Sequence, residues 1–314
     1  MNEIEEGFVI RKKGANYYVV SGDREVKCFL RGKFRISGDR DSVIPVVGDN
    51  VKFRKIEDSG SDDDVGLILS VGSRKSVFER SSRFGGGKRK ILGSNLDYIF
   101  LVHSVTEPDL NLRLIDRMIV AAEHGGIEPV LCINKIDLSD DPEALKKEIS
   151  PYINMGYKVL YCSVVEGRGI EEFRETLEGK RSLMAGPSGA GKTSIIARLQ
   201  PELELKVGTV SSKTGKGKHT TSHFELHPLN SGGYLGDTPG IREFGINHIE
   251  KNQLQLYFRD FSDFRSSCRF STCIHDHEPD CGVKRALEEG LISEKRYDSY
   301  IRMLKSLSEN QRDF

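Results

Sequence analysis

The 314-residue sequence has no net charge, no long apolar run and no tryptophan. Its 47 basic and 47 acidic residues balance, which excludes a uniformly basic nucleic-acid coat and an acidic disordered tail. Because no run of 18 apolar residues is present, we expect no membrane span. The N-terminal MNEIEEGF is acidic and lacks the apolar stretch of a signal peptide. These absences favour a cytoplasmic globular protein that contacts nucleic acid, if at all, through local basic patches.

Cysteine is scarce and unevenly spread. Three of the six cysteines, Cys268, Cys273 and Cys281, lie in the spacing C-x4-C-x-H-x5-C. A secreted disulfide protein would spread and pair its cysteines, so this cluster indicates a metal site in a reducing cytoplasm. Three thiolates and one imidazole form a closed tetrahedral set, which is typical of a structural zinc ion. The imidazole is that of His275 or, alternatively, His277.

Residues 1–72 are predicted to form a small β-domain. Short stretches rich in Val, Ile, Tyr and Phe alternate with glycines such as Gly14 and Gly22. The candidate strands are 7–13, 16–21, 24–31, 50–57 and 64–71. Five short strands suit a closed barrel, with the OB-fold as the natural candidate and another small β-domain as the alternative.

Residues 73–92 interrupt this pattern with a cationic, glycine-rich stretch. The segment SRKSVFERSSRFGGGKRK contains seven Lys or Arg residues, one Glu and three consecutive glycines. It is interpreted either as a solvated basic linker or as an arm that contacts the phosphates of RNA.

Residues 93–245 alternate apolar strands with amphipathic helices. Strands are expected at 99–102, 129–133, 158–162 and 182–185, with helices between them. This repetition predicts a parallel sheet with helices on both faces. Residues 246–314 are predicted to form a small helical unit, with helices near 249–257 and 292–308 around an irregular Cys/His segment that a metal would staple.

The segment GPSGAGKT matches the P-loop pattern GxxxxGK[ST] between a strand and a helix. Backbone N–H groups of such a loop, together with the helix N-terminus, bind phosphates. Lys192 would reach the β- and γ-phosphates, and the Thr193 hydroxyl would bind Mg²⁺. The candidate residues are Gly186, Pro187, Ser188, Gly189, Ala190, Gly191, Lys192 and Thr193.

Two other segments match the base-reading motifs of GTPases. Asn134, Lys135, Ile136 and Asp137 fit the pattern NKxD directly after a buried strand. An aspartate there accepts hydrogen bonds from guanine N1–H and N2–H₂, and adenine offers no such donor pair. Ser163, which follows the next strand, is a candidate for the second base-contacting loop.

The segment DTPG at 237–240 matches the DxxG motif. Asp237 would hold Mg²⁺ through water, and the Gly240 N–H would sense the γ-phosphate. The preceding KTGKGKHTTS has the composition of a switch that is ordered by nucleotide. Either Thr220 or Thr221 could complete the Mg²⁺ shell, and the sequence does not separate them.

The order of these motifs is circularly permuted. In an ordinary GTPase the P-loop comes first, whereas here NKxD and the second base loop precede it. Such permutation is tolerated where domain termini lie close together. As a result, the chain leaves DxxG and runs directly into the Cys/His unit.

The permuted series NKID, GPSGAGKT, HTTS and DTPG follows a predicted barrel with VVGDNV. It precedes the Cys/His motif, whose histidine and last cysteine lie in the segment HDHEPDCGVKRAL. This combination resembles the small-ribosomal-subunit-dependent GTPase family, called RsgA or YjeQ. The resemblance implies a multidomain α/β protein. Its parts would be an N-terminal OB-fold at 1–72, a basic linker at 73–92, a circularly permuted P-loop GTPase domain at 93–245 and a C-terminal zinc domain at 246–314.

The resemblance also implies function. Family members act late in maturation of the bacterial small (30S) ribosomal subunit, bind near its decoding region and hydrolyse GTP faster when bound to it. The OB-fold, the zinc domain and the basic residues at 74–90 would grip ribosomal RNA, and a monomer is expected. The resemblance also assigns residues. Guanine would be read by Asn134, Lys135 and Asp137, and the phosphates and Mg²⁺ would be held by the segment from Gly186 to Ser194. The zinc ligands would be Cys268, Cys273, His275 and Cys281.

The residue after DTPG departs from Ras-like GTPases. Ile241 stands where those proteins often carry a water-orienting glutamine, so intrinsic hydrolysis is expected to be slow. We hypothesise that His219, beside the switch threonines, acts in catalysis on the ribosomal subunit; alternatively it caps its loop or contacts RNA.

Two other functional classes compete with a GTPase switch. The protein could be an RNA-docking factor whose turnover of GTP is incidental, which slow hydrolysis would permit. It could also be an ATP-dependent kinase or transporter ATPase built on the P-loop, against which NKID and the Cys/His motif argue.

Overall fold

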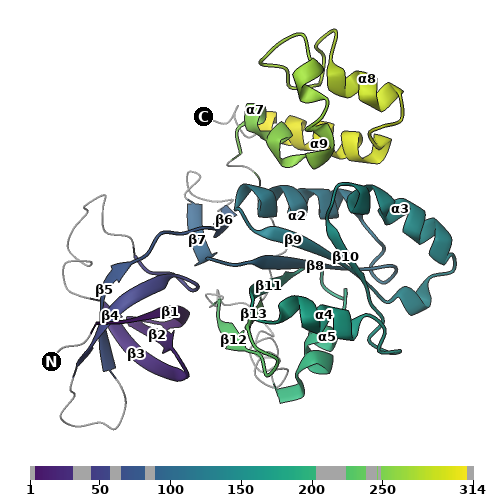
Figure 1. The fold of residues 1–314 in the computed structure, drawn as a ribbon. Helices are drawn as coiled ribbons and strands as arrows, with labels where there is room; N and C mark the ends of the chain where they lie inside the picture. Colours follow the sequence, from purple (N-terminus) through teal and green to yellow (C-terminus); the bar gives the residue numbers. More distant parts are fainter. Residues whose placement is uncertain are drawn as a thin grey trace.

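The computed structural model describes residues 4–30, 44–56, 65–81, 89–202, 224–237, 246 and 249–309. In this part of the chain a β-barrel adjoins a central sheet covered by helices, and a helical C-terminal unit rests on one of those helices (Figure 1). No helix in these ranges is long and apolar enough to cross a membrane.

The N-terminal strands close into a barrel in the order β1-β2-β3-β5-β4. Strands β3 and β5 pair in parallel, and the other neighbours are antiparallel, which is the Greek-key arrangement of an OB-fold. Alternate side chains such as Val9, Val19 and Phe53 are fully buried inside it. The predicted OB-fold is therefore confirmed. The strands are β1 (Ile4–Lys13), β2 (Asn16–Ser21), β3 (Arg24–Leu30), β4 (Asn50–Ile56) and β5 (Val65–Val71).

The central sheet has six strands in the order β10-β9-β8-β11-β13-β12. All neighbours pair in parallel except β12 and β13. The strands are β8 (Tyr98–Ser104), β9 (Glu128–Asn134), β10 (Lys158–Tyr161), β11 (Arg181–Ala185), β12 (Leu226–Pro228) and β13 (Tyr234–Asp237). The parallel sheet predicted from the strand–helix alternation is confirmed, with β12 as an added antiparallel edge.

Helices cover both faces of this sheet. In Figure 1, α2 (Leu112–His124) and α3 (Pro142–Asn154) lie on one face, and α4 (Ile170–Leu177) and α5 (Lys192–Leu199) lie on the other. Both longer helices begin at capping side chains. Asn111 accepts a hydrogen bond from Leu114 N, and Asp141 accepts from Glu143 N and Ala144 N. Local sequence thus sets where each helix starts.

The stretch predicted as a flexible basic linker is in part a hairpin. Strand β6 (Val77–Ser81) lies inside this stretch and pairs in antiparallel fashion with β7 (Arg89–Ser94), which extends two residues past its end. The reason is Phe78, which is buried and lies with its ring centroid 6.3 Å from that of Phe224. Arg74, counted among the basic residues expected to meet RNA, instead forms a two-bond ion pair with the fully buried Asp49.

The VVGDNV motif joins the barrel to the sheet. The Asp49 carboxylate accepts hydrogen bonds from Ser94 Oγ (2.6 Å) and Val46 N (2.8 Å) in addition to Arg74. The preceding Gly48 has φ of +94°, and a Cβ there would lie 1.8 Å from the Ser94 carbonyl oxygen. Only glycine permits this approach.

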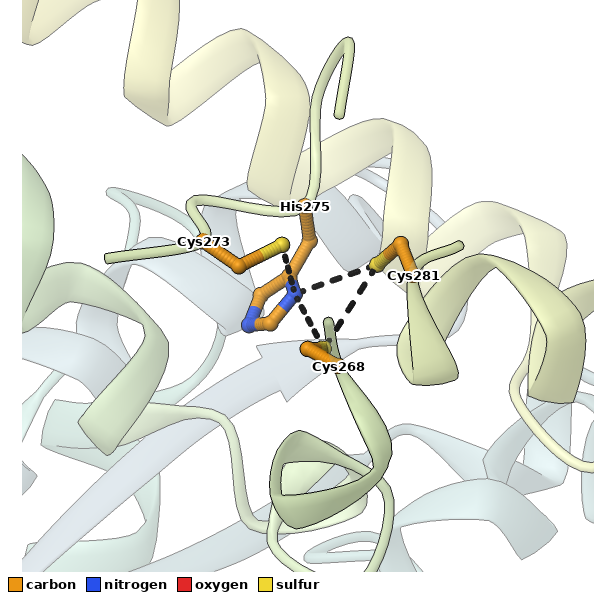
Figure 2. Close-up of side chains that lie close together, drawn as sticks. All are labelled: Cys268, Cys273, His275 and Cys281. Atoms are coloured by element: carbon orange, nitrogen blue, oxygen red, sulfur yellow. Dashed lines mark hydrogen bonds between the residues drawn. The ribbon is translucent and has the colours of Figure 1, made fainter. Parts of the chain in front are cut away.

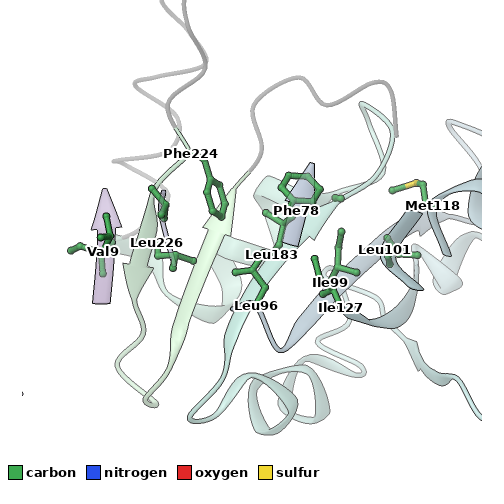
Figure 3. Packing of buried hydrophobic residues seen from close by; sticks show 14 of the residues in the cluster. Val9, Phe78, Leu96, Ile99, Leu101, Met118, Ile127, Leu183, Phe224 and Leu226 are labelled. Carbon is green, nitrogen blue, oxygen red and sulfur yellow. The ribbon is translucent and has the colours of Figure 1, made fainter. Parts of the chain in front are cut away.

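A single apolar core runs across this junction. It includes Val9 of the barrel, Phe78 of β6, and Leu183 and Leu226 of the central sheet. Figure 3 shows these side chains packed in one row from β1 to the sheet. The barrel is consequently held against the sheet by apolar side chains that both contribute to one core.

The C-terminal unit consists of short helices around one cluster of aromatic and aliphatic side chains. The region 249–257 forms only one α-turn followed by a 3₁₀ turn, and α8 was not expected from the sequence. Val120 of α2 belongs to the same cluster, so this unit completes its core on the central sheet domain. The elements are α7 (Lys251–Leu254), η2 (Gln255–Tyr257), η3 (Arg259–Phe261), η4 (Arg265–Ser267), α8 (Gly282–Glu288) and α9 (Glu294–Glu309).

A buried charge cluster lies where the C-terminal unit meets α2 and α3. Arg296 of α9 is 2% exposed and donates to Asp116 of α2 (2.6 Å) and Asp260 (2.9 Å). Tyr152 of α3 donates its hydroxyl to the same Asp116 carboxylate at 2.7 Å. The opposite charges raise the pKa of Arg296 against the effect of its burial, so the guanidinium stays charged.

Candidate functional site

The predicted P-loop occupies the turn from β11 to α5. Lys192 is the first residue of α5, and its ammonium donates to the carbonyl oxygens of Gly186 (2.8 Å) and Pro187 (2.9 Å). The side chains of Thr193 and Ser194 are exposed on the first turn of the helix. The N–H groups in the first turn of a helix point away from it and suit an anion such as a phosphate.

The NKxD segment lies directly against the P-loop. Asn134, the last residue of β9, donates its side-chain amide to Ala190 O at 3.0 Å. A Cβ on Gly191 would lie 2.2 Å from that amide nitrogen, and Gly191 has φ of +94°, so glycine is required there. Residues 56 positions apart therefore fit together without space for another side chain.

The second base-loop candidate lies beside NKxD. Ile136 N donates to Cys162 O, and Cys162 N donates to Ile133 O, which ties the two loops together. Ser163 is fully buried, and its hydroxyl oxygen accepts from Glu166 N at 3.1 Å. Asp137 sits in the 3₁₀ turn η1 (Ile136–Leu138) and is half-buried, just past the carboxyl end of β9.

A loop that the sequence reasoning did not single out forms a third wall of this site. The Lys135 ammonium donates hydrogen bonds to two backbone carbonyl oxygens of this loop, those of Glu107 and, at 3.5 Å, Thr106. Ser104 donates its hydroxyl to Pro108 O at 2.7 Å and so holds the same loop. The available signal was a polar segment following the strand next to the P-loop strand, where ligands bind in open α/β sheets.

His103 was likewise not selected from the sequence. It is the penultimate residue of β8 and is 1% exposed, and its Nε2 has no hydrogen-bond partner in the described part of the chain. Burial, and secondarily the charge of Lys192, lowers the pKa of His103 to about 3. The imidazole is therefore neutral at physiological pH.

Asp237 ends β13 and pairs in register with Met184 of the P-loop strand. Its backbone therefore lies beside the P-loop strand, as the DxxG assignment requires. The remaining switch predictions, His219, Thr220, Thr221, Gly240 and Ile241, lie outside the described residues.

The predicted cysteine–histidine set converges in the C-terminal unit (Figure 2). His275 Nδ1 lies 3.5 Å from Cys268 Sγ, 3.4 Å from Cys273 Sγ and 3.3 Å from Cys281 Sγ. The Sγ atoms of Cys268 and Cys281 are 3.9 Å apart, and all four candidate ligand atoms lie within 4.8 Å of one another.

These distances fit a metal. A tetrahedral zinc ion with bonds of about 2.3 Å to sulfur and about 2.0 Å to nitrogen gives edges of about 3.8 Å for S···S and about 3.5 Å for S···N. Burial lowers the pKa of His275 to about 4, so its imidazole is neutral, as a ligand must be. Burial also raises the pKa of Cys273 to about 12, and a bound cation would reverse that shift by binding the thiolate. His277, the alternative ligand, is not part of the cluster.

Two family models match the chain. The model of the RsgA N-terminal domain matches residues 6–61, and that of the RsgA GTPase matches residues 71–247. Among curated proteins, the small ribosomal subunit biogenesis GTPase RsgA of Caldanaerobacter subterraneus is 38% identical over 307 residues, covering 98% of this chain and 97% of the relative. The protein of the same name from Flavobacterium psychrophilum is 37% identical, covering 98% and 94%.

Solved structures agree with these matches. YjeQ from Thermotoga maritima superposes with a TM-score of 0.78 at 34% identity, covering 97% of this chain and 99% of that one. YloQ, described as a circularly permuted GTPase, has a TM-score of 0.77 at 28% identity, covering 98% and 96%. With the interlocked motifs and the Cys₃His cluster in place, these matches show that the chain is a member of the RsgA GTPase family.

Proposed function

We infer that this protein is a GTPase that acts in biogenesis of the small ribosomal subunit. Membership of the RsgA GTPase family and the names of the relatives support both halves of the statement. The observation that carries the nucleotide part is the contact between Asn134 and Ala190, because it joins the base-reading and phosphate-binding motifs at one edge of the sheet.

For guanine, we propose that Asp137 accepts from N1–H and N2–H₂ of the base. Asn134 and Lys135 would hold the loop against the P-loop, Ile136 would pair its backbone with the second base loop, and Ser163 would shape that loop. The hydrogen bonds of Asn134, Ile136 and Ser163 described above support this division of roles.

For the phosphates, the P-loop from Gly186 to Ser194 would bind through backbone N–H groups, with Lys192 as the cation. Thr193, Asp237 and either Thr220 or Thr221 would surround Mg²⁺, and Gly240 would contact the γ-phosphate. Mg²⁺ would neutralise charge on the β- and γ-phosphates. We also propose that His219 of this chain acts in catalysis when the chain is bound to the ribosomal subunit.

For the metal centre, we propose one structural zinc ion held by Cys268, Cys273, His275 and Cys281. Three thiolates and one imidazole leave no open position for a substrate, so the ion would supply a cross-link and no chemistry. That cross-link would stabilise a unit with a small core.

The partner would be the 30S subunit, contacted through its RNA, with the protein monomeric and in the cytoplasm. The barrel offers one suitable pair, since the Lys27 ammonium lies 5.7 Å from the ring centroid of the half-buried Phe29. Pairs of cations and aromatic rings are typical of surfaces that bind single-stranded RNA.

We also propose the domain limits 1–72, 73–92, 93–245 and 246–314. The basic stretch 73–92 then contains strand β6 and the start of strand β7.

The test is GTP hydrolysis by the purified full chain, alone and with purified bacterial 30S or 50S subunits. We expect a slow basal rate that rises at least about tenfold with 30S subunits only. Lys192→Ala is the control for a contaminating GTPase, because it removes the phosphate-binding cation and should abolish both rates. Equal rates with and without 30S subunits would contradict the proposed role.

A further inference from the structure

Beyond its four ligands, the metal centre has one outer contact that fixes the chemistry of the histidine. His275 Nε2 lies 2.8 Å from the side-chain oxygen Oε1 of Gln255. The opposite ring atom, Nδ1, faces the three sulfur atoms. Gln255 stands in η2, twenty positions before the histidine, and no ligand-spacing motif includes it.

The orientation of the Gln255 amide is determined by its other contacts. Its Nε2 lies 3.1 Å from the carbonyl oxygen of Asn252 and 3.1 Å from that of Cys273. Both are acceptors, so the amide nitrogen must face them, because a flipped amide would place its oxygen against two carbonyl oxygens. The Gln255 oxygen is thereby directed at the imidazole and can only accept a hydrogen bond.

The proton on His275 follows from this orientation. Because Oε1 accepts, His275 Nε2 must carry the N–H, which leaves the lone pair on Nδ1, the atom that faces the sulfurs. The loop around the ring is held separately: Glu278 accepts from Ile274 N (2.8 Å) and Asp276 N (3.1 Å). Tyr297 donates to His275 O at 2.6 Å.

We propose that Gln255 is a positioning residue of the metal centre, which selects the His275 tautomer with a free Nδ1 and thereby raises the affinity for the metal. The proposal rests on the zinc binding proposed above. Outer partners of ligating histidines commonly fix the tautomer in this way, and their loss weakens metal binding by about 10- to 100-fold.

The test separates the accepting oxygen of Gln255 from its donating nitrogen. Gln255→Met keeps the length of the side chain and removes both functions, whereas Gln255→Glu keeps an acceptor and loses the donors. Zn²⁺ affinity of each full-length protein is measured at one pH by competition with a chromophoric chelator. Gln253→Met is the matched control, because Gln253 lies on the adjacent turn and is not among the described hydrogen-bond partners of the ligands.

We expect Gln255→Met to weaken Zn²⁺ binding by about 10- to 100-fold and Gln253→Met to leave it unchanged. Gln255→Glu should weaken it less than Gln255→Met, because it keeps the acceptor for His275 although its second oxygen faces the carbonyl oxygens of Asn252 and Cys273. Equal weakening by Met and Glu would overturn the proposal, because the donors to Cys273 and Asn252 would then carry the effect. Unchanged affinity in both variants would overturn it as well.

A spectroscopic readout tests the tautomer directly and does not depend on whether a variant folds. In the unaltered chain with ¹⁵N-labelled histidine and bound Zn²⁺, long-range ¹H–¹⁵N correlations should show a proton on Nε2 and none on Nδ1 of His275. The opposite assignment would refute the role of Gln255. Failure of the unaltered chain to bind Zn²⁺ at all would instead refute the zinc centre, and with it this inference.

Discussion

At the scale of single residues, the proposed guanine specificity would depend on one half-buried carboxylate, that of Asp137. Asp137 belongs to a 3₁₀ turn that is tied by Ile136 N to the second base loop. Its acceptor atoms match two donors of guanine, and neither an amide nor a hydroxyl can accept in both places.

The substitution Asp137→Asn should therefore exchange the nucleotide preference. The new side-chain amide would keep one acceptor but would set its NH₂ against a donor of guanine. Loss of one hydrogen bond, and of the negative charge from the other, should weaken GTP binding by about 100-fold. Xanthosine triphosphate carries an acceptor where guanine has its amino group, so its binding should improve. Nucleotide titrations test this, with Asp140→Asn, an exposed neighbour, as control; retained GTP preference would contradict the assigned role of Asp137.

His103 should make folding stability depend on pH. Its folded-state pKa of about 3 lies below the unfolded value of about 6.5 because burial and Lys192 oppose its charge. The unfolded chain binds the proton first, so this contribution is complete above pH 6.5 and is lost as the pH falls from 6.5 toward 3. The loss is about 1.4 kcal/mol per pH unit, or about 2 kcal/mol at pH 5.

Urea denaturation of the unaltered chain and of His103→Leu between pH 8 and pH 4.5 measures this contribution. The free energy of unfolding of the variant should fall less steeply below pH 6.5, while the other titrating groups contribute equally to both curves. Parallel curves would show that His103 does not titrate as its surroundings indicate.

At the scale of elements, the turn before β4 determines how the barrel meets the sheet. Gly48 approaches β7 so closely that a Cβ would lie 1.8 Å from Ser94 O, and Arg181 of β11 donates to Gly48 O (3.3 Å) and Asn50 Oδ1 (3.0 Å). Asn95 donates to the same Gly48 carbonyl at 3.1 Å. One turn thus contacts β7 and β11 together.

Gly48→Ala should cost more than about 3 kcal/mol of stability, because both the backbone conformation and the contact with Ser94 must change. Gly14→Ala is the matched control: its φ of +61° is also positive, but a Cβ there would meet nothing within 4 Å. That variant should lose only about 1–2 kcal/mol. Thermal and chemical denaturation compare the two, and equal losses would mean that β7 moves away without cost.

At the scale of the whole molecule, the C-terminal unit is joined to α2 and α3 by the charge cluster of Arg296. The same helix bears Tyr297 and Tyr300, whose hydroxyls donate to His275 O and Ile274 O beside the Cys/His cluster. Helix α9 therefore contacts both the loop that carries His275 and the sheet domain.

Arg296→Met should destabilise the protein by about 3–5 kcal/mol, because it leaves the Asp116 and Asp260 carboxylates buried without their cation. The neighbouring Lys295 pairs with Glu148 of α3 across the same junction but is 68% exposed. Lys295→Met should therefore cost less than about 1 kcal/mol. Denaturation measures both, and hydrogen exchange should increase along α9 only for Arg296→Met; a similar cost for the two variants would contradict the importance of burial.

The sequence by itself determined the architecture and most of the proposed chemistry. Apolar periodicity placed the barrel strands, the parallel sheet and helices α2, α3 and α9, because burial of one face or of a whole strand leaves a local pattern. The spacings of GPSGAGKT, NKID and the Cys/His motif predicted their sites, because each motif places several functional groups within a few consecutive residues.

Only the tertiary structure decided what each of these groups contacts. Arg74 looks like a free cation in a basic stretch, yet it pairs with buried Asp49; Gln255 and Arg296 carry no local signature at all. The partner lies 20 positions away for Gln255 (His275), 25 for Arg74 (Asp49) and 180 for Arg296 (Asp116). Such contacts depend on how whole elements dock, and the apolar burial that drives docking is non-directional, so no short segment encodes which polar groups it brings together.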